Sequence, residues 1–370
     1  MLIVYDNYYA FLAAAAFGSG FFPIGVRNGW TAVAELTDEH GRIQLYLVGW
    51  VTWVLAMVLL ALVAWATAHW LPYVIATTIP NLAIYLFIRW TPESPRLRLT
   101  QGRVGEAEKI IARVMRANKQ EIPDGFREQL DEISGEIAED SRTGIKGLFS
   151  TMRMAKMTLI FAITLSVNDF FYIGGQLNTA NLPGNQFVNF AAIGLTELPS
   201  AFIGKFFMNR MGRRWLHVVC HALTALLFGV NVIISPDPSL WWLVLAVAMA
   251  AKTVSNVGWF INYVQTMECY PTCARVSGMN FCTVFSTVLS IFTPSVVFLG
   301  DTDIRALYGI FAAVGVFGTL VASLLPESFK EDFPECIEDL EKKSGHPYFS
   351  WFVWNRDNLE EDVESDTVKV

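Results

Sequence analysis

Ionisable side chains inside long apolar runs are the residues of this sequence with the clearest chemical potential. Lys252 stands in the run LAVAMAAKTVSNVGWF, and Arg27 stands in an earlier apolar segment. An ionisable group is expensive inside a membrane, so it is a functional candidate by default. Lys252 would then bind an ion within a helix bundle, or its long stem would carry the ammonium to the lipid headgroups. The sequence leaves both interpretations open.

The densest group of charges lies in NRMGRR, where Arg210, Arg213 and Arg214 share a Gly-containing turn. Guanidinium groups near helix ends bind backbone carbonyls and carboxylates. These arginines therefore hold helix ends in place, or they form ion pairs that break and re-form during a conformational change. Two further charge pairs are predicted on the same side of the molecule: Glu93 with Arg96, and Glu268 with Arg275.

No residue pattern predicts an enzyme or a bound cofactor. The sequence contains neither an HExxH zinc motif nor a glycine-rich phosphate loop ending in GK[ST], and its five histidines are scattered. His217 and His221 are spaced i, i+4 and would share one helix face, but no third metal ligand is apparent. We expect them to be core or interface side chains, with no metal bound.

Long apolar runs must position these residues, because the composition is that of a membrane protein. Of 370 residues, 53% are hydrophobic and only 16% are charged, against about 25% charged in soluble domains. A helix crosses a bilayer with roughly 20 apolar residues. The sequence therefore predicts an all-α, polytopic membrane helix bundle with about nine spans. These are placed at residues 8–33, 43–66, 70–90, 157–175, 186–207, 215–234, 240–263, 274–299 and 303–325.

A charged connector over residues 91–156 sets the orientation of the spans. It holds nearly half of the chain's 27 lysines and arginines, and loops rich in these residues stay in the cytoplasm. Gly105 to Asn118 places apolar residues on one helical stripe, which would lie along the bundle or dock a partner. The predicted division is a partial N-terminal half with three spans at 1–90, the connector at 91–156, a six-helix half at 157–326 and a cytoplasmic tail at 327–370.

Several motifs occur in an order that resembles the major facilitator superfamily. They are TPESPR after the third span, NRMGRR between the fifth and sixth, ECYPTCAR between the seventh and eighth, and LPES after the ninth. The stretches AHWLPYVIATTIPNL and YIGGQLNTANLPGNQFVNFAAIGLTELP resemble its family of organic cation, anion and carnitine transporters. The resemblance implies transport of small organic ions by alternating access at a site between two six-helix halves.

The resemblance also implies site residues. It matches Glu35 and Arg42 to an acid and an arginine that follow the family's fourth helix. Thr287 stands where cation carriers of the family have aspartate and anion carriers have arginine, so the sign of the substrate's charge is not predicted. The cavity residues that the resemblance implies are Trp30, Tyr172, Gln176, Lys252, Trp259 and Thr287.

The sequence departs from the family at its N-terminal end. Its nine spans match the fourth to twelfth helices of the family, and the first three helices have no counterpart. We therefore keep a second hypothesis, in which the chain is a transport-inactive membrane protein that binds or regulates a partner. The family's usual location is the plasma membrane. The last residues, Val368 to Val370, would suit a PDZ-type domain that captures a C-terminal carboxylate.

Overall fold

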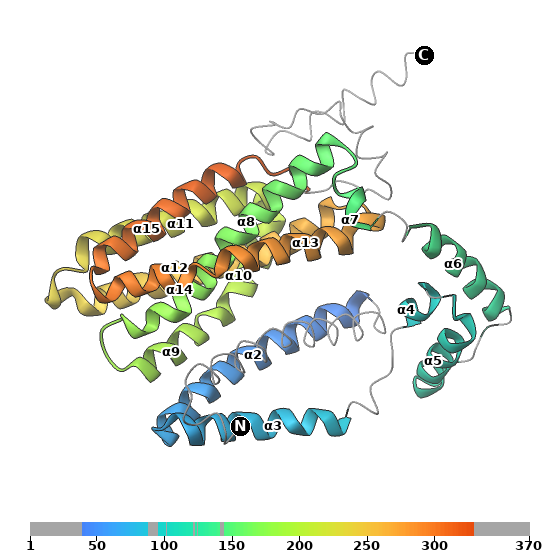
Figure 1. The fold of residues 1–370 in the computed structure, drawn as a ribbon, viewed down its shortest axis with the longest axis horizontal. Coiled ribbons are helices and arrows are strands. Elements are labelled where there is room, and N and C mark those ends of the chain that lie inside the picture. The colour runs from blue at the N-terminus through green and yellow to red at the C-terminus, as the bar shows by residue number, and fades with distance from the viewer. Residues whose placement is uncertain are drawn as a thin grey trace, which may run out of the picture. The chain divides into compact units, whose positions relative to one another are not determined.

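The computed structural model describes residues 39–87, 95–100, 102–120, 123, 125–140 and 144–328, and these residues form helices joined by short turns (Figure 1). The all-α prediction is confirmed. The chain divides into two compact units, Met1–Thr52 with Val74–Arg142 and Trp53–Tyr73 with Thr143–Val370. Several predicted positions lie outside the described residues: Arg27, Trp30, Glu35, Glu93, Val368 to Val370, and the side chains of Arg42 and Arg96.

Seven segments of the described chain are long and apolar enough to cross a membrane, which agrees with the prediction of a multi-pass membrane protein. The predicted span at 8–33 lies outside the described residues, and α3 (Trp70–Phe87) contains a shorter apolar stretch, Trp70–Ile79. The seven segments are built from α2 (Glu39–Thr67), α8 (Met152–Leu177), α9 (Gln186–Leu195), α10 (Glu197–Met211), α11 (Arg213–Ile234), α12 (Trp241–Cys269), α13 (Thr272–Ser290), α14 (Thr293–Phe298) and α15 (Ile304–Ala322).

Two spans that the sequence predicts as continuous are each made of two helices. The span at 186–207 breaks between α9 and α10, and the span at 274–299 breaks between α13 and α14. A proline follows each break, Pro199 and Pro294. Proline has no backbone N–H and its ring clashes with the carbonyl four residues earlier, so the preceding helix ends.

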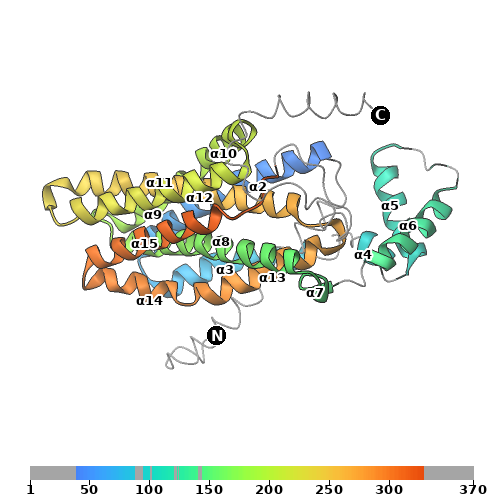
Figure 2. The same ribbon diagram turned by 90° about the horizontal axis from the view of Figure 1, so that it is seen from above.

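The second unit holds the bundle that carries the candidate site. Helix α11 packs along both α15 and α12, and α8 packs along α13 and α12 (Figures 1 and 2). Small residues allow the closest approach: a Cβ on Gly315 would lie 2.7 Å from the Cβ of Ala225, and one on Gly318 would lie 2.8 Å from Val167. Such contacts are typical of helices that associate within a bilayer.

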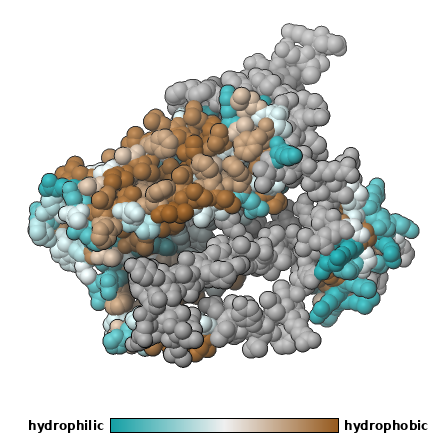
Figure 3. Space-filling view, viewed as in Figure 1, coloured by the Kyte–Doolittle hydropathy of each residue, from teal (hydrophilic) through white to brown (hydrophobic). Residues whose placement is uncertain are grey.

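The exposed surface of this bundle is apolar, as expected for helices that face lipid. On the face shown in Figure 3, hydrophobic side chains cover the middle of the bundle and hydrophilic ones lie towards its ends. Ile233 is 78% exposed and Leu320 is 64% exposed. Three exposed tryptophans lie at helix ends, Trp65 and Trp70 on α2 and α3 and Trp241 on α12, and tryptophan is enriched at membrane interfaces.

The connector forms a small cluster of its own in the first unit. It contains α4 (Pro95–Thr100), α5 (Val104–Ala117) and α6 (Phe126–Asp140), and α5 lies where the sequence predicts a helix at Gly105 to Asn118. Buried Leu99, Ala107 and Leu130 form the core, and Ile111 packs against them. The apolar stripe of α5 is therefore packed against α4 and α6 through Ala107 and Ile111. The division of the chain into domains at residues 90, 156 and 326, which the sequence predicts, stays a prediction.

Candidate functional site

Lys252 is buried in the bundle, on α12, and its surroundings are those of a bound cation. Its side chain is held against Tyr172 of α8: Nζ donates a hydrogen bond to the Tyr172 carbonyl oxygen at 2.9 Å and lies 3.7 Å from the centroid of the Tyr172 ring. The residue is 3% exposed. The ammonium is thus turned into the bundle, against Tyr172.

A carboxylate of α10 provides the opposite charge. Glu197 is completely buried and interacts electrostatically with Lys252 and with the Tyr172 side chain. The Tyr172 hydroxyl also accepts a hydrogen bond from Nε1 of Trp53 on α2, at 3.1 Å. One tyrosine therefore joins the ammonium, the carboxylate and a tryptophan from three other helices.

A second carboxylate, Asp169, lies one turn before Tyr172 on α8. It accepts hydrogen bonds from Nε1 of Trp259 at 3.0 Å and from the hydroxyl of Ser286 at 2.6 Å. The Trp259 ring stacks on Tyr263 with an interplanar angle of 10° and also neighbours Tyr172 at 6.4 Å between centroids. Asp169 thereby orders an aromatic surface formed by α8 and α12.

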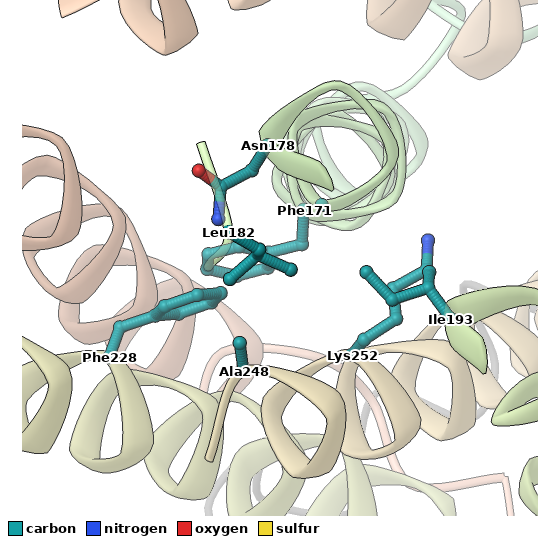
Figure 4. A pocket seen from close by; sticks show the side chains of 8 residues that line it. Phe171, Asn178, Leu182, Ile193, Phe228, Ala248 and Lys252 are labelled. Carbon is teal, nitrogen blue, oxygen red and sulfur yellow. The ribbon is translucent and has the colours of Figure 1, made fainter. Parts of the chain in front are cut away.

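A small cavity lies beside Lys252. Its volume of about 10 Å³ suits a single water molecule. Figure 4 shows Lys252 next to Ile193, with Phe171, Leu182 and Phe228 across the space. The cavity is enclosed mainly by apolar groups, so the ammonium is shielded from bulk water on this side.

A wider groove of about 230 Å³ lies in the same unit, where α2 and α3 approach η2 (Asn178–Ala180) and α9. Its walls carry no charged residue, and its polar groups come from Tyr73, Thr179 and Gln186. The groove is therefore an apolar neighbour of the charged cluster and not part of it.

Most of the predicted cavity residues that lie within the described part of the chain are close together. Lys252, Tyr172 and Trp259 lie together, and the Gln176 side chain interacts with Tyr172. Thr287 lies apart from them in an exposed position, where its hydroxyl donates to the Thr283 carbonyl oxygen of its own helix at 2.8 Å. The roles of these residues stay predictions.

The sequence interpretation missed the two carboxylates of the site. Asp169 and Glu197 both lie within spans that the sequence predicts, at 157–175 and 186–207. The rule that drew attention to Lys252, an ionisable group inside an apolar run, applies to them equally. Applying it throughout would have found all three charges.

The predicted arginine cluster forms a charge clamp at the beginning of α11. Arg213 binds Glu268 with two hydrogen bonds of 3.1 Å, from Nε and Nη2 to the two carboxylate oxygens. Glu327 accepts from the backbone N–H groups of Arg213 at 2.8 Å and Arg214 at 3.2 Å. A carboxylate is favourable there because the first N–H groups of a helix lack intrahelical partners and carry partial positive charge.

Other residues of the clamp fix its geometry. Ser328 donates its hydroxyl to Glu268 at 2.6 Å. Gly212 has φ +80°, and a Cβ there would lie 2.8 Å from a Glu327 oxygen, so glycine is required on both counts. Glu327 belongs to the LPES motif, but sequence interpretation did not select it. The clamp thus joins α11 and α12 to the segment after α15.

The remaining predicted charges of this region have other contacts. Arg210 lies over the Phe206 ring at 4.0 Å, and Nε of Arg275 donates to the Tyr270 carbonyl oxygen at 3.3 Å. Glu268, which the sequence paired with Arg275, is bound by Arg213. Tyr270 is buried, and this burial raises the pKa of its hydroxyl above the usual range.

The histidine pair belongs to the core of the bundle. The rings of His217 and His221 stack at 4.8 Å, and Nε2 of His217 lies 3.2 Å from Nδ2 of Asn168. No group of three or more His, Cys, Asp or Glu side chains suited to a metal occurs among the residues that the structure describes. Their surroundings agree with the core interpretation.

Comparison with known families decides the class of the chain. A family model described as "Sugar (and other) transporter" matches residues 56–339. The chain belongs to this family. The chain shares its fold with the xylose transporter XylE from E. coli, which was solved in a partially occluded inward-open conformation. That match has a TM-score of 0.55 at 16% identity and covers 81% of this chain and 67% of XylE.

The curated relatives of this chain include one that is an organic cation transporter by name. The organic cation transporter protein of Drosophila melanogaster is 31% identical over 280 residues, which cover 74% of this chain and 51% of that protein. Solute carrier family 22 member 7 of Rattus norvegicus is 28% identical over 312 residues, 84% of this chain and 58% of the relative.

These matches confirm the predicted superfamily and its organic ion transporter branch, whose members are transporters and not enzymes. The chain spans little more than half the length of these relatives.

Proposed function

We propose that this chain moves a small organic ion across a membrane by alternating access, through the cluster formed by Lys252, Glu197, Tyr172, Asp169 and Trp259. The observation that carries the proposal is a set of three charges at the meeting of α8, α10 and α12, of which Lys252 and Glu197 are buried and Asp169 is half-buried. Ionisable residues inside a membrane bundle mark substrate and ion pathways. Aromatic rings beside carboxylates suit organic ions, which present both charge and apolar surface.

The same proposal assigns a role to the charge clamp. Alternating access requires helix ends to separate on one side of the membrane while they close on the other. The Arg213–Glu268 pair and Glu327 hold three chain segments together at one end of the bundle. We place this end, the connector and the C-terminus in the cytoplasm and the protein in the plasma membrane, on the basis of the charge distribution and the family's usual location.

Uptake of radiolabelled organic cations and anions into cells that express the 370-residue chain tests the proposal. Surface biotinylation of the same cells verifies delivery to the plasma membrane. We expect saturable uptake that Lys252→Ala abolishes and that Lys205→Ala, at an exposed position of α10, leaves unchanged.

Absence of uptake by a chain that reaches the surface would favour the second function, a transport-inactive membrane protein that binds a partner. A PDZ-type partner at the C-terminus would be one form of it, and deletion of the last three residues would then remove the partner from affinity-purified protein.

A further inference from the structure

The outer side of α5 carries a row of positive charges, which we call the basic stripe. It consists of Lys109, Arg113 and Arg116, whose spacing places them on one side of the helix over about 10 Å. All three side chains are exposed. Arg116 follows buried Ala107 by about two and a half turns, so the stripe lies opposite the side that packs into the connector core.

The acidic residues of α5 lie beside the stripe but are paired with other arginines. A carboxylate oxygen of Glu106 lies 3.3 Å from Nε of Arg98, and the other lies 3.9 Å from Nη1 of Arg103. Glu108 lies 3.8 Å from Nη1 of Arg127. Within the described part of the chain, no ion pair involves a cation of the basic stripe. The stripe therefore presents three positive charges that the connector does not neutralise.

The shape of the stripe suits a flat anionic surface. Lysine and arginine have the longest side chains of the helix, and the neutral residues beside them, Gly105 and Ala112, are small. The three cationic groups can therefore touch one plane at the same time. Like charges four residues apart, such as Lys109 and Arg113, also destabilise a helix. Contact with anions would remove this repulsion.

The other outer side of the connector is acidic, which gives the cluster an electrical direction. Helices α5 and α6 lie side by side (Figures 1 and 2) and share a core through Ala107 and Leu130. Glu128 and Glu132 are exposed on α6, on the side opposite Leu130. An anionic surface would therefore attract the α5 side of the connector and repel the α6 side.

The membrane is the anionic surface to which the connector is attached. Residues 88–94 separate the end of α3 at Phe87 from the start of α4 at Pro95, and they reach at most about 25 Å when fully extended. After α7 (Gly144–Gly147), the chain enters the apolar helix α8 at Met152. Cytoplasmic leaflets carry anionic lipids, and the charge distribution places the connector on that side.

We propose that the basic stripe of α5 binds anionic lipid headgroups of the cytoplasmic leaflet and holds the connector against the membrane. This inference rests on the cytoplasmic placement given under the proposed function, but it does not require transport. Each lysine or arginine near an anionic leaflet strengthens binding about fivefold, so three together strengthen it roughly a hundredfold. The guanidinium groups of Arg113 and Arg116 also suit paired hydrogen bonds to phosphate oxygens.

Hydrogen–deuterium exchange of the purified full chain in lipid nanodiscs tests the inference. One preparation contains phosphatidylcholine alone, and the other contains phosphatidylcholine with phosphatidylserine as the anionic component. We expect phosphatidylserine to slow amide exchange in α5 about tenfold or more, because docking must be released before the helix opens. Salt at about 1 M should abolish the difference, because it shortens the screening length to about 3 Å.

Two triple variants separate charge from helix stability. Lys109→Gln with Arg113→Gln and Arg116→Gln removes the stripe, so phosphatidylserine should no longer slow exchange in α5. Lys109→Arg with Arg113→Lys and Arg116→Lys keeps all three charges, so the slowing should persist. Exchange in phosphatidylcholine alone verifies folding, because in each variant it must be no faster than in the wild type.

A matched control removes the same number of positive charges elsewhere. Lys146→Gln with Lys205→Gln and Arg305→Gln changes exposed residues outside the stripe. This variant has the same net charge as the triple glutamine variant of the stripe. It should keep the wild-type response to phosphatidylserine.

Four results would overturn the inference. Equal exchange in the two lipid mixtures, or slowing that survives the triple glutamine variant of the stripe, would show that the stripe does not bind the leaflet. Slow exchange in phosphatidylcholine that is lost on deletion of the acidic residues 357–366 would assign the stripe to the C-terminal tail. Equal slowing by dissolved glycerophosphoserine would make it a site for free phosphates. Failed uptake would refute the proposed transport and leave this measurement unaffected.

Discussion

Breaking the Arg213–Glu268 pair should cost much more than breaking an exposed ion pair of the same chain. The two side chains are 13% and 14% exposed and share two hydrogen bonds of 3.1 Å. Hydrogen bonds to charged groups contribute roughly 1.5–3 kcal/mol each, and removing both charges from water offsets part of this gain. We therefore expect a coupling free energy of about 2 kcal/mol between the two side chains.

A double-mutant cycle measures this coupling. Arg213→Met, Glu268→Gln and the double variant would be unfolded in mixed detergent micelles, and the cycle isolates the pairwise free energy from effects on the unfolded state. The matched control is Arg127→Met with Glu108→Gln, a pair at 3.8 Å in which Arg127 is 69% exposed. Its coupling should stay below about 0.5 kcal/mol. Equal couplings for both pairs would refute the view that burial strengthens the clamp.

Three further predictions follow from the structure. Gly212→Ala should lower the free energy of unfolding by about 2 kcal/mol, because the φ of +80° and the nearby Glu327 oxygen both exclude a Cβ. In the control Gly229→Ala the new Cβ meets nothing within 4 Å, so this substitution should be neutral or stabilising. Leu130→Ala should loosen the connector cluster and speed tryptic cleavage at Arg127 about tenfold, without changing the unfolding of the bundle; unaltered cleavage would contradict the packing of α4, α5 and α6. Trp259→Phe should raise the KM for uptake about tenfold, because the ring persists but its N–H donation to Asp169 is lost; an unchanged KM would remove Asp169 and Trp259 from the site.

The helices were predictable because membrane spans have a strong local signal. Apolar length alone located the seven helical segments that are long and apolar enough to cross a membrane, and the excess of lysine and arginine marked the connector. The breaks at Pro199 and Pro294 carry a local signal too, since proline ends the preceding helix, but a search for continuous apolar runs passes over it.

The pairings within the site were less predictable, because they depend on tertiary contacts between distant residues. Glu268 binds Arg213, 55 positions away in the sequence, whereas Arg275 is the nearer arginine along the chain. On α13 the difference is one residue: Ser286 contacts Asp169, whereas Thr287 is exposed. Successive residues of a helix point about 100° apart, so an alignment error of one position exchanges a buried side chain for an exposed one.

Substrate counterflow in vesicles that contain the purified chain is the most direct test of the central claim, that the charged cluster of α8, α10 and α12 is the substrate site. Vesicles loaded with unlabelled tetraethylammonium would accumulate the labelled compound transiently. The account predicts that Asp169→Asn abolishes counterflow and that Asp301→Asn, an exposed aspartate at the end of η4 (Leu299–Asp301), preserves it. Counterflow that survives Asp169→Asn unchanged would contradict the account.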